Sequence, residues 1–254
     1  MRLVSYDRRG ARRLAAWVGD LVVDLPDAVG HPAFPATLES LLARNGGTTM
    51  EAARAALEYP GALKEFAVPR ARMLAPLAMS DRPIQILEPG ELLPPPPRGM
   101  ELVCRPELAA IIGRAGRNLD EGQARAALFG YTLVNGWHLR RPGEDELIPI
   151  GTSVGPCVAT ADEFDPSQRT VIVSIGGSPV RETRLGSAAA RRFARTIARA
   201  SGMAEVTPGE IYGLSLFPAP IVVPRRRRKG GDTNATAAVE IAGIGKLENG
   251  VPTT

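Results

Sequence analysis

The chain has 254 residues, of which 44% are hydrophobic and 23% are charged, a composition typical of a globular protein built around one large domain. No apolar run approaches the roughly 20 residues that a membrane-spanning helix needs. The opening stretch MRLVSYDRRG also lacks the apolar segment of a signal peptide. We therefore expect a cytoplasmic protein that has no membrane partner.

The net charge of +4 comes almost wholly from arginine, because the chain has only three lysines. The densest basic run, residues 225–229, is followed by Gly-Gly-Asp and is predicted to be a solvated loop. An alternative is a patch that binds nucleic acid or a membrane surface, but no aromatic residues are interspersed with the arginines. The sequence therefore predicts no nucleic-acid partner.

The first 70 residues are predicted to form a small α/β unit. Its strand patterns are 2–6, 13–18 and 21–24, and its helix patterns are 36–44 and 49–59, the second with Thr49 as a candidate cap. Residues 71–100 are rich in proline and end in LLPPPPRG, which indicates a linker or wrapping segment.

Strand patterns dominate residues 101–254 and predict a mostly-β domain. These patterns are 107–113, 127–135, 154–160, 170–177, 209–216 and 236–245. One helix is expected from a Ser187 cap to about Ser201, with Phe193 and Ile197 on the same face. Cys104 and Cys157 lie far apart and form no C-x-x-C spacing, which argues against a zinc site.

The stretch GYTLVNGWHLRRPG, residues 130–143, concentrates scarce residue types. GYTLVN is predicted to be a buried strand that leads into a corner containing Trp137, His138, Arg140 and Arg141. A histidine has an ordinary pKa near 6.5 and can transfer protons, and guanidinium groups can hold an oxyanion. For each residue the alternative is structural: core packing for Trp137, and solvated loop positions for the others.

The order of short motifs resembles the fumarylacetoacetate hydrolase family over nearly the whole chain. The motifs are RLVSYDRRGARRLAAWVGDLVVDL, PELAAIIGRAGRNLDEGQARAALFGYTLVN, SVGPCVATADEFDP, VIVSIGG, the Ser187 helix, PGEIYG and VEIAGIGKLENGV. The resemblance implies an α+β, β-rich fold, a mixed β-roll around a central pocket, and a homodimer. It also implies an enzyme in which Mg²⁺, held by three carboxylates, binds a small keto acid.

Laid onto this sequence, most of the family's catalytic positions are changed. The first metal-binding glutamate falls at Arg105 and the metal-binding aspartate falls at Gly136, whereas the second glutamate is retained as Glu107. The family's lysine falls at Glu146, and its histidine–glutamate lid has no histidine counterpart between residues 83 and 105. One carboxylate cannot hold Mg²⁺, which needs several oxygen ligands. We therefore expect no metal and no cofactor.

The family's T-G-T-P loop falls at residues 214–217, so both threonines are lost, whereas the family arginine survives as Arg140. The predicted catalytic residues are His138, Arg140 and Tyr212. The predicted substrate-binding residues are Arg105, Glu107, Trp137, Arg141, Leu214 and Leu216. We expect Arg105 to fill the former metal volume and to pair with Glu107, and an apolar pocket of several hundred Å³ to surround Arg140.

These changes favour a repurposed, metal-independent enzyme that acts on a small keto-acid-like or polyketide-like molecule. A cyclisation, isomerisation, decarboxylation or pericyclic step in a natural-product pathway is expected, since such steps can proceed by shape and hydrogen bonding alone. The first alternative is a non-catalytic ligand-binding protein or partner subunit. The second is an ordinary Mg²⁺-dependent keto-acid hydrolase.

Overall fold

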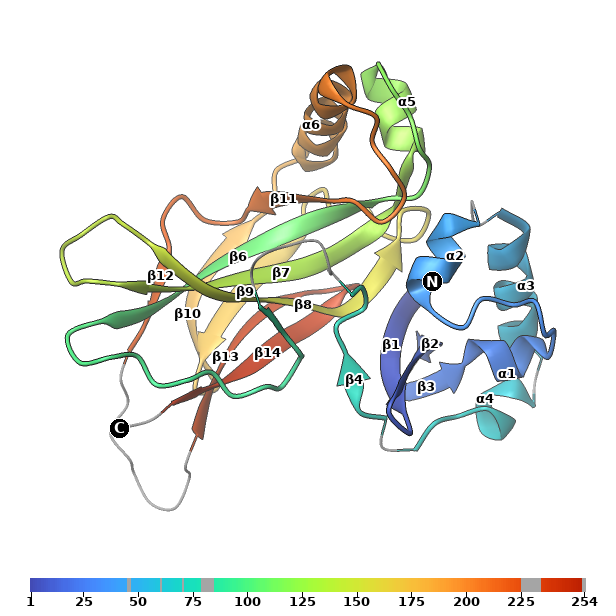
Figure 1. Cartoon of the computed structure of the whole chain (residues 1–254), viewed down its shortest axis with the longest axis horizontal. Helices are drawn as coiled ribbons and strands as arrows, with labels where there is room; N and C mark the ends of the chain where they lie inside the picture. The colour runs from blue at the N-terminus through green and yellow to red at the C-terminus, as the bar shows by residue number, and fades with distance from the viewer. Residues whose placement is uncertain (45–46, 60, 70, 79–84, 225–233, 253–254) are drawn as a thin grey trace.

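The computed structural model describes residues 1–44, 47–59, 61–69, 71–78, 85–224 and 234–252. Two β-sheets lie against each other, and the helices form two groups, one beside the N-terminal strands and one above the sheets (Figure 1). This architecture confirms the α+β, β-rich class. The arginine run at 225–229 lies outside the described residues.

The larger sheet carries the candidate site. Its order is β11-β6-β7-β8-β1-β2-β3, with β12 beside β6, β4 beside β1 and β5 beside β8. Its strands are β1 (Arg2–Arg8), β2 (Ala11–Val18), β3 (Leu21–Asp24), β4 (Met73–Leu74), β5 (Ile86–Leu87), β6 (Glu101–Ile112), β7 (Leu128–Arg140), β8 (Ile148–Thr160), β11 (Ile211–Ser215) and β12 (Ile221–Val223).

The smaller sheet covers one face of the larger one and has the order β10-β9-β13-β14. Its strands are β9 (Thr170–Ile175), β10 (Ser178–Arg184), β13 (Asn234–Ile241) and β14 (Gly245–Pro252). Apolar side chains from both sheets form the main core, among them Trp137 and Cys157 from the larger sheet and Val173 and Val239 from the smaller. Burial of this apolar area is the main force that holds the two sheets together.

Helices gather at the two ends of the larger sheet (Figure 1). At the N-terminal end lie α1 (Leu25–Val29), α2 (Leu38–Ala43), α3 (Gly47–Glu58) and α4 (Ala62–Glu65), and at the other end lie α5 (Glu121–Ala126) and α6 (Ala189–Met203). Leu38, Leu41 and Leu42 of α2 pack on β1 and β2 in a second core. Within the described ranges, no helix is both long enough and apolar enough to span a membrane.

The N-terminal strands continue the larger sheet without a break. β1 pairs antiparallel with β8, Arg2 opposite Ala159 and Leu3 opposite Val158. The expected division at residues 70 and 100 stays a prediction, although this pairing joins the first unit to the third through backbone hydrogen bonds.

Several local expectations were wrong. Thr49 lies inside α3, which begins at Gly47, and α6 is preceded by Ala188, which makes no side-chain capping bond. Ser187 instead accepts a hydrogen bond through its carbonyl oxygen from the Ser167 hydroxyl, at 3.3 Å. The sequence pattern gave no sign of β10, because its side chains are almost all exposed and do not alternate.

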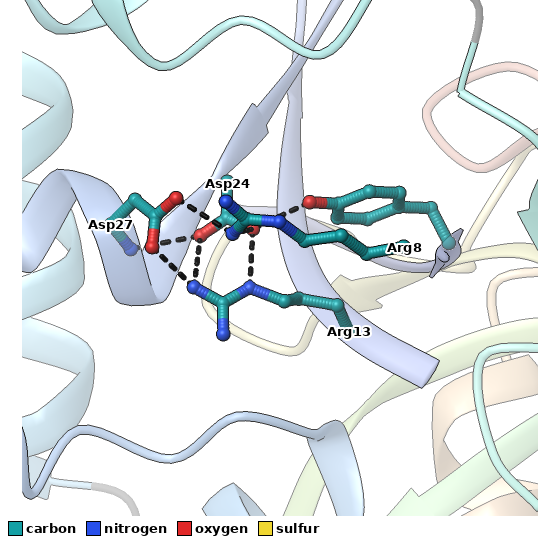
Figure 2. A network of polar contacts seen from close by, with 5 residues as sticks. Arg8, Arg13, Asp24 and Asp27 are labelled. Atoms are coloured by element: carbon teal, nitrogen blue, oxygen red, sulfur yellow. Dashed lines mark hydrogen bonds and ion pairs between the residues drawn. The ribbon is translucent and has the colours of Figure 1, made fainter. Parts of the chain in front are cut away.

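A network of charged side chains joins β1, β2 and α1 (Figure 2). The Arg13 guanidinium donates from Nε to Asp24 at 2.6 Å and also pairs with Asp27. Arg8 reaches the same two carboxylates, and the Tyr6 hydroxyl donates to Asp24 at 2.5 Å. The Asp24 side chain is only 4% exposed, so its charge depends on these donors.

Replacing Arg13 by methionine should lower the free energy of unfolding by about 2 kcal/mol, because the buried Asp24 carboxylate loses its main partner. Replacing Arg8 by methionine is the matched control and should cost less than about 1 kcal/mol, since Arg8 is 44% exposed. Urea denaturation of both variants measures the difference. Equal losses would contradict the assignment of Arg13 as the main partner.

Unfolding should also become easier in acid. Burial alone would raise the pKa of Asp24, but hydrogen bonds from Arg13 and Tyr6 outweigh it and hold that pKa below its usual range. The stabilisation from Asp24 is therefore complete above about pH 4 and is lost as the pH falls through the lowered pKa of the folded state. Denaturation at several pH values measures this fall in the free energy of unfolding. The fall should be smaller in Asp24→Asn, which lacks the titrating carboxylate.

Candidate functional site

The candidate site lies on one face of strands β6 and β7. Arg105 pairs with Gly136 in the antiparallel register, and Gly136 pairs in turn with Thr152 of β8. Because side chains alternate along a strand, Arg105, Glu107, His138 and Arg140 share one face. We call the face defined by these four residues and Gly136 the β6–β7 face.

The stretch from Gly136 to Arg140 is strand, not the corner that the sequence predicted. β7 runs through to Arg140, and the turn follows it. Continued strand geometry places Trp137 and His138 on opposite faces, so the two residues cannot act in one pocket. His138 lies half-buried on the β6–β7 face, whereas Trp137 is completely buried in the core.

The missing side chain of Gly136 makes room for His138. A Cβ atom placed on Gly136 would lie 3.0 Å from Cε1 of the His138 ring and 3.9 Å from Cβ of Arg105. The first distance is tighter than nine in ten Cβ contacts in proteins, so the His138 ring would have to move by a few tenths of an ångström. The absence of a Cβ atom at Gly136 therefore leaves room for the imidazole of His138.

His138 is held as a neutral imidazole with one nitrogen free. Its Nδ1 lies 3.2 Å from the Gly136 carbonyl oxygen, and since a carbonyl oxygen only accepts, Nδ1 carries the hydrogen. Burial lowers the pKa of His138, and the charge of Arg105 lowers it further, against the opposing effect of the Gly136 carbonyl. Within the described part of the chain nothing bonds Nε2, which keeps its lone pair.

Arg105 and Glu107 do not form the expected ion pair. The Glu107 carboxylate turns toward β11, where Oε2 would lie 2.1 Å from a Cβ on Gly213 and Oε1 accepts a long hydrogen bond of 3.4 Å from Ser215. Arg105 is exposed and makes no ion pair with any residue that the structure describes. Its guanidinium charge is therefore available next to His138.

The other two predicted arginines are engaged elsewhere. Arg140 donates to Glu101 across the strand pair at 2.9 Å, and its Nε is buried without a described acceptor. Arg141 is 70% exposed, follows the end of β7 and lies 3.7 Å from Glu144. The β6–β7 face thus includes Arg140 but not Arg141.

The predicted apolar and phenolic residues lie away from the β6–β7 face. Trp137 and Leu216 belong to the main core, and Leu214 packs against it. The Trp137 indole nitrogen donates to Ser153 Oγ at 3.0 Å. Tyr212 packs near α6 and donates its hydroxyl to Glu210 at 2.8 Å. The structure therefore does not bring Trp137, Tyr212, Leu214 or Leu216 together with His138.

The family model for the C-terminal domain of fumarylacetoacetate hydrolases matches residues 50–252, more than half of the chain. The chain belongs to the fumarylacetoacetate hydrolase family. Its fold is shared with solved members: a maleylpyruvate hydrolase from a Sphingobium species has 20% identity and a TM-score of 0.75, with all of both chains covered. A 5-carboxymethyl-2-hydroxymuconate delta-isomerase from Mycobacterium smegmatis has 17% identity and a TM-score of 0.65, again with full coverage.

A curated relative is a mitochondrial oxaloacetate tautomerase of Xenopus laevis. It is 25% identical over an alignment of 182 residues, and the match covers 65% of this chain and 54% of the relative. The match thus spans about half the length of that protein. By their names, these relatives are a hydrolase, an isomerase and a tautomerase.

The residues on the β6–β7 face do not fit the divalent metal ion that the family implies. The resemblance places metal-binding carboxylates at positions 105, 107 and 136. Position 105 is an arginine, and position 136 is a glycine with the His138 imidazole beside it. Glu107 is the one acid retained among the three positions. Across the described ranges, no group of three or more His, Cys, Asp or Glu side chains is placed to hold a metal. Mg²⁺ needs several oxygen ligands in octahedral array, which these side chains do not supply.

Two residues of the β6–β7 surroundings were missed by the sequence reasoning. Glu101 pairs with Arg140, and Ser215 contacts Glu107. Alternation of side chains along β11 could have identified Ser215, because it is the polar residue that pairs with Glu107 in the antiparallel register. Two cavities lined by described residues, of about 330 and 370 Å³, lie elsewhere, so the expected pocket around Arg140 stays a prediction.

Proposed function

We propose that this chain is a metal-independent enzyme that shifts a proton within a small keto-acid-like or polyketide-like molecule on the β6–β7 face. One observation carries the proposal: the neutral His138 imidazole and Arg105 flank Gly136 on one face, and the charge of Arg105 acts on the imidazole. Among the described residues, neither Nε2 of His138 nor the Arg105 guanidinium has a partner. This pair combines a base with a cation, which are the two groups that enolisation requires.

In the proposed step, Nε2 of His138 removes a proton from the carbon next to a substrate carbonyl. The electron pair moves onto the carbonyl oxygen, and the Arg105 guanidinium stabilises the resulting enolate by charge-assisted hydrogen bonds. The protonated imidazole then returns the proton to another atom of the same molecule. The reaction is an isomerisation in which the atoms balance and no ion is needed.

The same two groups can serve a decarboxylation or a cyclisation that passes through an enolate, and a pericyclic step would use the guanidinium alone. A role in a natural-product pathway, a homodimeric assembly and a cytoplasmic location remain predictions. A non-catalytic ligand-binding protein is the alternative. It is favoured by the ion pairs that engage Arg140 and Arg141.

The deciding experiment measures turnover with and without metal. Enol-to-keto conversion of oxaloacetate and a panel of β-dicarbonyl and α-keto acids is followed by ultraviolet absorbance in EDTA, then with Mg²⁺ or Mn²⁺ added. We expect rates equal within about twofold, because the charge of Arg105 replaces that of the ion. Activity that appears only with metal would contradict metal independence, and no turnover of any compound would favour the non-catalytic alternative.

A further inference from the structure

A cavity of about 370 Å³ lies where the start of α6, the residues after α5 and the segment after β8 meet. Its volume is in the range of small-molecule sites. Tyr131 on β7 contributes to its wall and points to the core side of the larger sheet, opposite the face that carries His138. The cavity is therefore separate from the β6–β7 face.

The Tyr131 hydroxyl is an unused donor in this cavity. The side chain is only 4% exposed and is flanked by the rings of Phe164 and Phe193, each with its centroid 5.5 Å away. Of the residues that the structure describes, none hydrogen-bonds its hydroxyl, which can therefore donate to a molecule in the cavity. Burial, aided by the charge of Asp165, raises the pKa of Tyr131 to about 12, so the phenol keeps its proton.

The start of α6 supplies further donors at the same cavity. Ala188, which precedes the helix, makes no side-chain capping bond, and the first turn contains no acidic residue. The backbone N–H groups of Ala190 and Arg191, both in the cavity wall, have no acceptor in the described ranges. Free N–H groups at the start of a helix of 15 residues favour an anion.

Two arginines add positive charge at the rim. Arg125 and Arg191 line the cavity and are exposed, and neither forms an ion pair with a described residue. The one acidic lining residue, Asp165, accepts a 2.8 Å hydrogen bond from the backbone of Ser167. Leu128 and Phe164 give the inner wall an apolar character.

We propose that this cavity binds a small organic carboxylate with a flat apolar body. The body would lie against Phe164 and Leu128, and the carboxylate would accept from the Tyr131 hydroxyl, the N–H groups at the start of α6 and the guanidinium of Arg191. The site is distinct from the one proposed for catalysis, so one protein molecule would hold two small acids at once.

The test is isothermal titration calorimetry of the full chain with benzoate. Arg191→Gln should weaken binding about tenfold, the loss of one charge-assisted hydrogen bond, and Tyr131→Phe about fivefold, the loss of one neutral bond. Ala190→Leu should abolish binding by filling the cavity. Arg192→Gln is the matched control, since Arg192 is the next residue on α6 and does not line the cavity; it should change nothing.

Two comparators sharpen the test. Benzyl alcohol, which lacks the charge, and inorganic phosphate, which lacks the apolar body, should both bind at least tenfold more weakly than benzoate. Circular dichroism confirms that each variant is folded. The proposal is overturned if benzoate does not bind, if Tyr131→Phe and Ala190→Leu both leave its affinity unchanged, or if Arg105→Gln removes binding and thereby places the ligand on the β6–β7 face.

Discussion

Replacing His138 by glutamine should lower kcat for the proposed proton transfer by about 100-fold or more, the usual contribution of a positioned general base. Glutamine keeps a polar side chain of similar size but has no basic nitrogen. KM should change little, because the cationic Arg105 remains. The assay is the oxaloacetate or keto-acid conversion with the best rate on wild-type protein.

Arg141→Gln is the control for this prediction, since Arg141 is 70% exposed and lies beyond the end of β7. It should retain wild-type activity. The wild-type rate should fall in acid as His138 becomes protonated, and because burial lowers the pKa of His138, that fall should occur below the ordinary value near 6.5. Full activity in His138→Gln would mean that the base is a different residue.

Replacing Trp137 by alanine should lower the free energy of unfolding by about 4 kcal/mol, as expected for removing a large buried aromatic side chain. The indole has no exposed surface, and its N–H donates a hydrogen bond to Ser153 on the neighbouring strand β8. Guanidinium chloride denaturation measures the loss. Trp137→Phe refills much of the space and should cost roughly half as much.

The same variants separate a core role from the substrate-binding role that the sequence predicted for Trp137. In Trp137→Phe, activity should stay within about twofold of wild type, because the side chain lies on the opposite face from His138. A Trp137→Phe protein that is folded but has lost its activity would show that the indole contacts the substrate.

The fold followed from the sequence wherever strand patterns alternated clearly. The N-terminal strands and the signature strand GYTLVN lie where their patterns predicted. The strand predicted at 236–245 instead crosses the turn between β13 and β14, and β14 was not predicted. The predicted corner at 136–143 is instead strand as far as Arg140. Alternation along this strand assigns Trp137 and Leu139 to one face and His138 and Arg140 to the other, as the register shows.

Other features had no local signal. β10 is exposed along almost all of its length, so neither face required apolar residues. Arg105 and His138 come together only because β6 pairs with β7, and a helix and two turns separate these strands in the sequence. The cavity at Tyr131 is formed by three segments that are distant in the sequence. Such contacts are set by tertiary packing, which a linear pattern does not contain.

The filled space at Gly136 also has an evolutionary consequence. An aspartate introduced there would meet the His138 ring, only 3.0 Å from the new Cβ, and its charge would lie beside the guanidinium of Arg105 instead of a metal ion. Building a metal-binding site on this face would therefore require changes at His138 or Arg105 as well as at Gly136. Those changes would remove groups proposed for the present chemistry, so selection for that chemistry would oppose the formation of a metal site.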